Sequence, residues 1–409
     1  MMVRIAGVGL VTVGLFRLLV GAAFGRHACR TVFNRRPTAL LSTWLSPLLR
    51  VTRPLELAWR LLTAPLRVAG PDVVLLGEVR CGTTTLASLL RSDLGMQGPF
   101  TPWDVPLANG KESFYFAGHY FGCVAPRLYR LCFPFIWAHW LDRVVRRQLH
   151  LPPPLLFDGC ASHLSAPWAP ELMQRLQREE MGGRPMVFVV CVREPVSQHL
   201  SWWCLEQGSM AFATSLGFGA DWHPQPTRYG YPPATFAEAI ELSRSDVVSR
   251  MWSDAELELA SGCWLPDWAA PFPNGQLSAF DRFGHFADNL QRWFERFGRD
   301  AFVIVSLEQL ASQPDLVLDR IVAKCEEVLG TTPRRAGSKV VAPVLNAAPL
   351  LADHLEPEPE FLRRLAADYR PINEQLFELL GEDLGWHADP KYWWYEGTAA
   401  GGHACSRAG

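Results

Sequence analysis

The chain has 409 residues, of which 49% are hydrophobic and 20% charged, and its formal net charge is −2. This composition excludes an intrinsically disordered chain, and the length accommodates one large domain or two small ones. Because there is no basic excess, we expect no nucleic-acid partner and look for anion binding in local clusters instead. The ten cysteines are scattered without a C-x-x-C pair or another metal-ligand spacing, so no metal site is expected.

The N-terminal stretch Ile5–Phe24 is almost entirely apolar or glycine, and its length would let one helix cross a bilayer. The arginines that follow it would favour a cytoplasmic body by the positive-inside rule. From the start of the chain to Gly70, Glu56 is the only acid, and a segment with arginines and so few acids is also typical of an organelle transit sequence. We interpret residues 1–26 as a membrane anchor or targeting segment and residues 27–70 as a basic, proline-containing linker, so that the globular domain begins at Pro71.

A phosphate-binding loop is predicted after the first buried strand. The apolar run Val73–Leu76 ends at Gly77, a polar turn follows, and leucines then recur at helical spacing, which indicates strand, loop and helix. Gly82 would let the backbone approach an anion, and the amides that open the helix would point at that anion. The cofactor-binding candidates in this loop are Arg80, Cys81, Gly82, Thr83, Thr84 and Thr85.

The spacing Gly77-x4-Gly82 resembles a Walker A loop, but Thr83 occupies the position at which a nucleoside triphosphatase carries lysine. The cation of this loop is Arg80, which comes before the glycine. In that respect the loop resembles the 5'-phosphosulfate-binding loop of sulfotransferases, which use 3'-phosphoadenosine 5'-phosphosulfate as the sulfuryl donor. The resemblance implies that Arg80 and the amides of residues 82–85 hold the 5'-phosphate and that no metal is required.

A charged pair, Lys111-Glu112, comes shortly before the aromatic run Phe114–Phe116. Aromatic side chains favour burial and would hold the carboxylate at the edge of the core, although a surface ion pair at a strand edge has the same pattern. Carbohydrate sulfotransferases of the heparan sulfate and chondroitin type carry a similar Lys-Glu segment here. The resemblance implies that Glu112 is the catalytic base and that Lys111 stabilises the sulfuryl oxygens, with His119 and Asp158 as alternative bases.

Two segments follow before the next phosphate-binding element. Residues 121–149 are apolar, contain tryptophan and become basic toward their end, so we expect a helix broken at Pro134 that packs against the domain or lines an acceptor cleft. Leu155–Gly159 is expected to be a short buried strand with Asp158 at its C-terminal end. The resembled family continues with a Ser-Pro-x-Tyr turn, from which Cys160–Leu164 departs.

The continuous apolar run Met186–Val192 is typical of a parallel strand that is buried on both faces. Arg193 follows it directly, and Ser201 lies eight positions later in a helical pattern. Both would face the carboxyl edge of the sheet, where open α/β folds bind ligands, and an arginine offers a phosphate a bidentate fork. Arg193 and Ser201 match the 3'-phosphate site of sulfotransferases, and Gln198 stands where that family often has a further arginine.

The rest of the chain contains one irregular segment and several regular ones. Residues 208–273 are rich in tryptophan, proline and glycine, and such a loop would form an acceptor-binding wall or lid. Further elements are predicted as a helix over Phe283–Phe297, a strand over Ala301–Leu307, a helix over Val317–Leu329 closed by Gly330, a terminal helix over Leu365–Trp386 that resembles that of carbohydrate sulfotransferases, and a disordered tail over 391–409.

Four apolar strand candidates that alternate with helices predict an α/β fold of the P-loop nucleoside-triphosphatase type over residues 71–390, with a mostly parallel sheet and helices on both faces. The resemblance implies a sulfotransferase that acts on a hydroxyl or amine, with a carbohydrate as the favoured acceptor. A P-loop kinase of small molecules and a non-catalytic nucleotide- or sugar-binding relative are the alternatives. The expected location is the Golgi membrane, with one membrane-crossing segment and a lumenal catalytic domain, and an organelle transit peptide is the alternative.

Overall fold

The computed structural model describes residues 58–99, 111, 113, 126–161, 163–166, 169–204, 235–244, 281–333, 335 and 357–396. The chain divides into two compact units, Met1–Leu62 and Thr63–Gly409, and the second contains the sheet and every candidate site residue described below. Several predicted features lie outside the described residues, namely the stretch Ile5–Phe24, Glu112, His119, most of 208–273 and residues 397–409.

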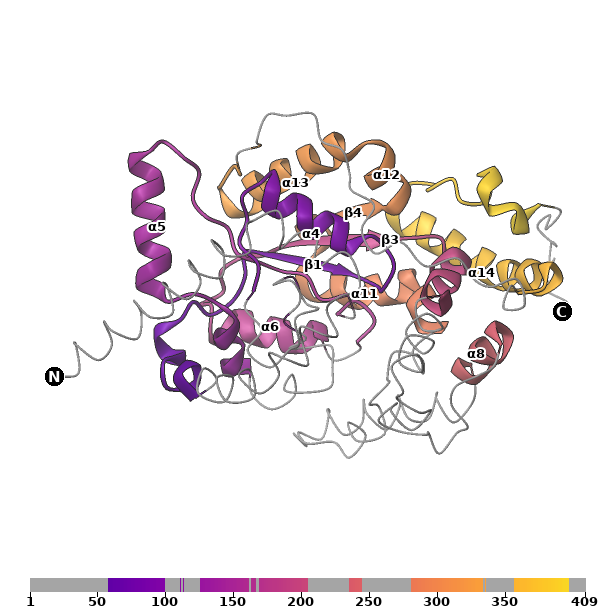
Figure 1. Cartoon of the computed structure of the whole chain (residues 1–409), viewed down its shortest axis with the longest axis horizontal. Coiled ribbons are helices and arrows are strands. Elements are labelled where there is room, and N and C mark those ends of the chain that lie inside the picture. Colours follow the sequence, from indigo (N-terminus) through magenta and orange to yellow (C-terminus); the bar gives the residue numbers. More distant parts are fainter. Residues whose placement is uncertain are drawn as a thin grey trace, which may run out of the picture. The chain divides into compact units, whose positions relative to one another are not determined.

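Four parallel strands form one sheet in the order β2-β1-β3-β4 (Figure 1), which confirms the predicted α/β class. The strands are β1 (Val73–Gly77), β2 (Phe157–Asp158), β3 (Val187–Val192) and β4 (Phe302–Ser306). Every residue of the four strands is buried, as expected of continuous apolar runs that are covered on both faces.

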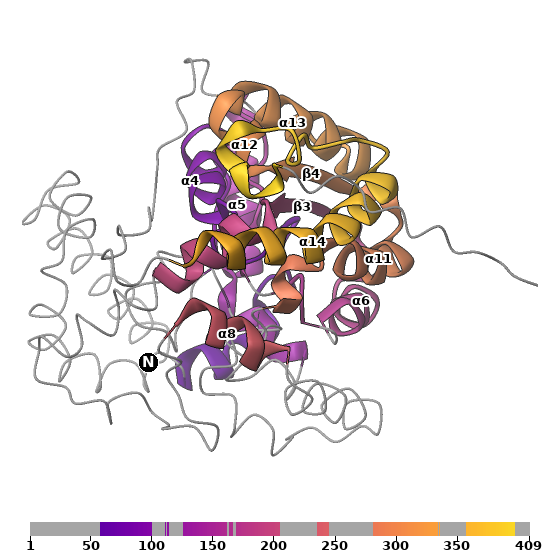
Figure 2. The ribbon, with the colours of Figure 1, turned by 90° about the vertical axis from the view of Figure 1, so that its right-hand side faces the viewer.

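Helices cover both faces of this sheet (Figures 1 and 2). One face carries α4 (Thr83–Ser92), α12 (Leu307–Ser312) and α13 (Pro314–Leu329). The other carries α6 (Ala169–Glu179) and α11 (Phe286–Phe297), with α14 (Pro359–Leu380) packed against α11. Residues 195–204 are helical and follow β3. Other described elements are η1 (Ala64–Leu66), η3 (Pro126–Cys132), α5 (Ile136–Gln148), α8 (Phe236–Ser243), η6 (Asp281–Gly284), η7 (Arg299–Ala301) and η9 (Pro390–Tyr395).

Local chemistry explains why β4 turns directly into two helices. The Ser306 hydroxyl accepts the Gln309 amide at 3.1 Å, and the Gln309 side chain accepts the Ser306 amide at 3.2 Å, which is a capping box at the start of α12. Pro314 lies in the first turn of α13, and Gly330 ends that helix with a φ of 62°. The predicted closure of this helix by Gly330 is therefore confirmed.

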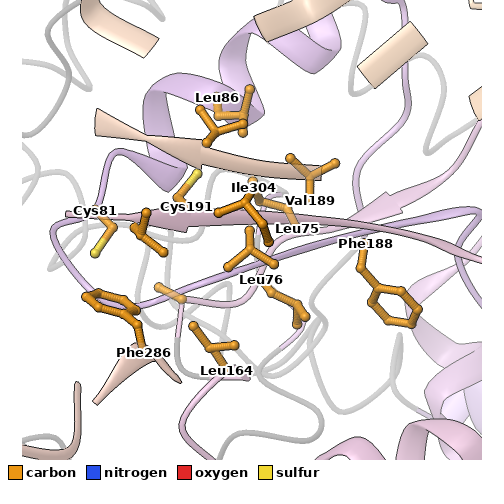
Figure 3. Close-up of a cluster of buried hydrophobic side chains, with 14 of the residues drawn as sticks. Leu75, Leu76, Cys81, Leu86, Leu164, Phe188, Val189, Cys191, Phe286 and Ile304 are labelled. Carbon is orange, nitrogen blue, oxygen red and sulfur yellow. The ribbon is translucent and has the colours of Figure 1, made fainter. Parts of the chain in front are cut away.

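An aromatic contact holds α11 against the sheet. The ring of Phe188 in β3 is fully buried, with its centroid 5.5 Å from that of Trp293 and 4.6 Å from that of Phe297. Cys81 and Cys191 lie in the same core as small buried side chains (Figure 3). Truncation of a core ring such as Phe188 to alanine would cost about 3–5 kcal/mol.

The expected packing role of residues 121–149 is wrong for the helix within them. α5 begins just after Pro134, as predicted, yet none of its residues is buried. The ordered chain also continues past residue 390, where a tail was expected, because η9 buries Tyr392, Trp394 and Tyr395. Both corrections concern which side chains are buried in the core, and amino-acid composition alone does not determine which side chains are buried.

The expected single-pass Golgi location is also corrected. Within the part of the chain that the structure describes, no helix is both long enough and apolar enough to cross a bilayer. Even the 22-residue α14 carries charged residues along its length. The stretch that suggested a membrane-crossing segment, Ile5–Phe24, lies outside the described residues.

Candidate anion-binding site

The site lies at the carboxyl edge of the sheet, between the ends of β1 and β3. Gly77 of β1 is in register with Cys191 of β3, so the loop after β1 and Arg193 after β3 leave the sheet close together. Gly82 begins α4 with a φ of 90°, and a Cβ there would lie 2.8 Å from Leu307 Cδ1, so the position requires glycine. Gly82 at the N-cap makes no side-chain capping bond, and the positive end of the α4 dipole would favour an anion there.

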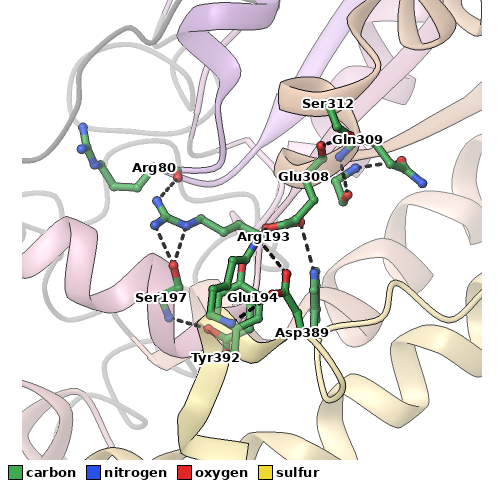
Figure 4. Close-up of polar contacts among 12 residues, drawn as sticks. Arg80, Arg193, Glu194, Ser197, Glu308, Gln309, Ser312, Asp389 and Tyr392 are labelled. Atoms are coloured by element: carbon green, nitrogen blue, oxygen red, sulfur yellow. Dashed lines mark hydrogen bonds and ion pairs between the residues drawn. The ribbon is translucent and has the colours of Figure 1, made fainter.

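The Arg193 side chain contacts the backbone of Arg80 at this edge (Figure 4). Arg193 Nη1 donates to the carbonyl oxygen of Arg80 at 2.9 Å, although the two residues are 113 positions apart. Arg193 Nε and Nη2 donate to Ser197 Oγ at 3.0 and 2.6 Å, and Arg80 Nε donates to Ser201 Oγ at 2.9 Å. The two predicted phosphate-binding elements therefore form one cluster of two guanidinium groups and two hydroxyls.

The hydrogen-bond partners within this cluster differ from those predicted from the sequence. The sequence pairs Ser201 with Arg193, whereas the structure places the Ser201 hydroxyl on Arg80 and the Ser197 hydroxyl on Arg193. Sequence reasoning missed Ser197, although its position one helical turn after Arg193 is a signal that could have found it.

The loop between β1 and α4 is held in a strained shape. Arg80 has a φ of 70°, in the left-handed region that residues other than glycine rarely adopt. Arg193 binds the carbonyl of this same residue, and Gln198 Nε2 donates to the preceding carbonyl, that of Val79, at 3.0 Å. Gln198 is fully buried. Strain of this kind persists only where surrounding contacts impose it, so the helix after β3 fixes the geometry of the loop.

Two positive charges share this small region. Burial lowers the pKa of Arg80, and the nearby charge of Arg193 lowers it further. The adjacent acid, Glu194, directs its carboxylate to the amides of Val196 and Ser197 at 2.9 and 2.7 Å. A bound anion with two charged groups would relieve the repulsion between the guanidinium groups, which gives the cluster a preference for such ligands.

Lys111 reaches the same loop from a different segment. Its Nζ lies 3.0 Å from Thr83 Oγ1 at the start of α4, and its side chain is buried. The backbone carbonyl of Lys111 accepts the Gly159 amide at 2.8 Å, just after β2. A lysine therefore contacts the residue that stands at the Walker lysine position, and its charge lies at the helix terminus where an anion would bind.

Asp158 anchors the segment that carries Lys111. Its carboxylate is fully buried and accepts the Ser113 amide at 2.9 Å, the Ser113 hydroxyl at 2.5 Å and the Tyr129 hydroxyl at 2.6 Å. Burial raises the pKa of Asp158, although these hydrogen bonds act in the opposite direction. Because both oxygens are occupied inside the core, Asp158 is poorly placed as a base and suits a positioning role for the backbone at Ser113, next to Glu112 in the sequence.

The other predicted residues contribute differently. The Cys81 side chain is buried. Burial, and to a smaller extent the charge of Glu78, raises the pKa of its thiol well above the ordinary value, so Cys81 packs as a neutral group. Thr85 is buried and Thr84 is half-buried at the first turn of α4. Glu112, the predicted base, lies outside the described residues, and its role stays a prediction.

Sequence reasoning also missed a contact between the C-terminal segment and β3. Glu194 is buried and accepts the Tyr395 hydroxyl at 2.9 Å, in addition to the amides of the following helical turn. Burial raises the pKa of Glu194 to about 7. The position of Glu194 directly after Arg193 was the available signal, but its partner is 201 positions away and no local pattern indicates it.

A second carboxylate fastens η9 to the end of β4 (Figure 4). Glu308 accepts the Tyr392 hydroxyl at 2.5 Å, Lys391 Nζ at 3.1 Å and Trp386 Nε1 at 3.3 Å. Burial by itself would raise the pKa of Glu308, but the contacts with Tyr392 and Lys391 outweigh it and lower that pKa. The C-terminal segment is therefore bound to residues at the ends of both β3 and β4.

Comparisons with family models and with curated proteins gave no match. Among solved structures, the crystal structure of a sulfotransferase from Alicyclobacillus acidocaldarius is similar to this chain, with a TM-score of 0.42 and 17% sequence identity. The similarity covers 78% of this chain and 98% of that chain. Similarity at this level does not assign the chain to a family, so its function has to be inferred from its own residues.

Proposed function

We propose that this protein transfers a sulfuryl group from 3'-phosphoadenosine 5'-phosphosulfate to a hydroxyl or amine, with a carbohydrate as the favoured class of acceptor. The proposal rests on the hydrogen bond from the Arg193 side chain to the Arg80 carbonyl oxygen. This bond brings together two arginines that follow the carboxyl ends of neighbouring strands. A nucleotide with phosphate groups at both the 3' and 5' positions presents two separate anions, and the cluster offers a guanidinium group to each.

The residues present fit the two phosphate groups of this donor. Arg80 and the amides at the start of α4 would hold the 5'-phosphate, since a helix N-terminus and a cation favour the same anion. Arg193 would hold the 3'-phosphate. The hydroxyls of Ser197 and Ser201 lie within hydrogen-bond distance of the two guanidinium groups and would add donors to the same anions.

The bound donor would supply a sulfuryl group on a phosphate leaving group. As in phosphoryl transfer, positioning and charge stabilisation dominate such a reaction. Arg80 and the α4 amides would stabilise the negative charge on the departing phosphate, and Lys111 would place its charge near the sulfuryl oxygens. Glu112 would take the proton of the acceptor, while Asp158 keeps the backbone around Glu112 in place.

Calorimetric titration of the full chain with 3'-phosphoadenosine 5'-phosphate and with ADP tests the proposal. A hydrogen bond to a charged group contributes about 1.5–3 kcal/mol, which corresponds to about 10- to 150-fold in affinity. The 3'-phosphorylated nucleotide should therefore bind at least about tenfold more tightly than ADP. A P-loop kinase would show no such preference.

Two variants and one control test which arginine gives the preference for the 3'-phosphorylated nucleotide. Arg193→Ala should abolish the advantage of the 3'-phosphate, and it should also weaken ADP because it releases the Arg80 carbonyl. Arg80→Ala should weaken both nucleotides and leave the advantage of the 3'-phosphate in place. Arg175→Ala removes a partly exposed arginine from α6, where it pairs with Glu179, and should change neither affinity. Equal binding of the two nucleotides by the unmodified chain would refute the proposal.

A further inference from the structure

The amphipathic helix α5 exposes its apolar side. Trp137, Trp140, Leu141 and Val145 recur at helical spacing, and their exposed fractions are 54, 61, 48 and 46%. Ile136, at the start of the helix, is 51% exposed. The helix stands apart from those that cover the sheet (Figure 1). Large side chains gathered in this way on one face usually mark an interaction surface.

The polar side of the same helix is turned toward the protein. His139, Asp142 and Arg146 follow one another at three- and four-residue spacing and are all half-buried. Arg146 Nε donates to Asp142 Oδ1 at 3.0 Å. Burial lowers the pKa of His139, which also lies within range of the charge of Asp72, just before β1. A helix that packs on a core shows the reverse arrangement, so the apolar side of α5 is available to something outside the described domain.

The charge beside this apolar side is positive. Arg143 and Arg147 are exposed and lie one turn apart, and neither forms an ion pair with a residue that the structure describes. The only acid in the helix, Asp142, is already engaged by Arg146. An occupant of this surface must therefore accept tryptophan side chains next to arginines that no described acid neutralises, which favours an anionic amphiphile.

We propose that α5 lies flat on the surface of an anionic lipid bilayer, with Trp137, Trp140 and Leu141 among the headgroups and acyl chains and with Arg143 and Arg147 on lipid phosphates. Tryptophan is enriched at membrane–water interfaces, and arginine is attracted to the negative surface potential. Such a contact needs no membrane-crossing helix. It is independent of the proposed sulfuryl transfer.

The N-terminal part of the chain is a less suitable occupant. Residues 1–57 contain many arginines and a single acid, Glu56, so their charge has the same sign as that of Arg143 and Arg147. Covering α5 with that segment would bring like charges together. An anionic bilayer would attract both.

Sedimentation of the full chain with vesicles tests the proposal, with phosphatidylcholine alone compared with phosphatidylcholine that contains about 30 mol% phosphatidylserine. We expect tighter binding to the anionic vesicles, and the difference should diminish as salt is raised. Arg143→Gln with Arg147→Gln should weaken the binding to anionic vesicles about thirtyfold, from the contribution of each arginine near such a surface. Trp137→Ser with Trp140→Ser should weaken it about tenfold or more.

Matched controls remove exposed side chains of the same kinds elsewhere. Arg363→Gln on α14 and Leu316→Ser on α13 should leave vesicle binding unchanged, and thermal melting should show that all variants remain folded. Equal binding to both kinds of vesicle, or binding that the α5 variants do not alter, would overturn the proposal. Self-association that the tryptophan variants abolish without any lipid would overturn it too, because the surface would then belong to a second copy of the chain.

Discussion

Replacement of Asp158 should have a large effect on stability. The carboxylate of this residue is fully buried and accepts three hydrogen bonds, two from Ser113 and one from Tyr129. Asp158→Ala leaves these donors without that acceptor. The backbone amide of Ser113 cannot turn away, and we assign it a cost of about 2 kcal/mol. The two hydroxyls can bond to one another, so each is assigned about 1 kcal/mol, and the total is about 4 kcal/mol.

Asp158→Asn separates the shape of this side chain from its charge. The asparagine keeps a carbonyl oxygen for the Ser113 amide and can donate to the hydroxyls, so we expect a loss of about 1 kcal/mol. Burial raises the pKa of Asp158, which means that the folded protein holds the proton more tightly than the unfolded chain. The wild type therefore loses stability as pH rises above the ordinary carboxyl range, and its advantage over the asparagine variant should shrink as pH rises through and above that range.

Urea unfolding of the wild type and of both Asp158 variants measures these effects. Asp319→Ala is a suitable control, because Asp319 is an exposed carboxylate on α13 that pairs with Arg335 and should contribute less than about 1 kcal/mol. A loss of less than about 1 kcal/mol in Asp158→Ala would show that the three hydrogen bonds are not what holds the segment around Glu112.

Three further predictions concern the same edge of the sheet. Gly82→Ala places a methyl group 2.8 Å from Leu307 Cδ1 at a φ of 90°, so urea unfolding should show a loss of about 1–3 kcal/mol, and an unchanged midpoint would contradict the close approach. Lys111→Met removes the charge beside Thr83, and calorimetry should show an affinity about tenfold lower for the sulfated donor but a smaller change for the product without sulfate. Burial raises the pKa of Glu194 to about 7, above the ordinary value of 4.5, so ionisation should lower the stability of the wild type by up to about 3 kcal/mol between these pH values. Glu194→Gln should lack this slope, and parallel pH profiles would exclude Glu194 as its source.

The elements that carry the site could be predicted because their signals are local. Met186–Val192 and Ala301–Leu307 are strands buried on both faces, so an uninterrupted apolar run identified them to within a residue or two at each end. The role of Gly82 could be predicted because a glycine separates a polar turn from a helix at this point of the sequence. Arg193 could be assigned to the carboxyl edge because it comes directly after an apolar run.

The contacts across the site could not be predicted, because they depend on how separate elements are placed. Spacing alone put Ser201 on the same side as Arg193, but the rotation of the helix after β3 and the path of the loop after β1 bring its hydroxyl to Arg80. The contact of Lys111 with Thr83 likewise depends on where β2 pairs with β1. For α5, composition indicated a helix but not which of its sides faces the protein.

Gln198 explains why this site contains two guanidinium groups rather than three. An arginine at this fully buried position would add a third positive charge near Arg80 and Arg193, and burial together with the charge of Arg193 already lowers the pKa of Arg80. Glutamine instead donates to the carbonyl of Val79, directly before the left-handed turn at Arg80. A site with fixed donors needs less reorganisation when an anion binds, so the hydrogen bond of Gln198 would preorganise the loop for the phosphate group proposed above.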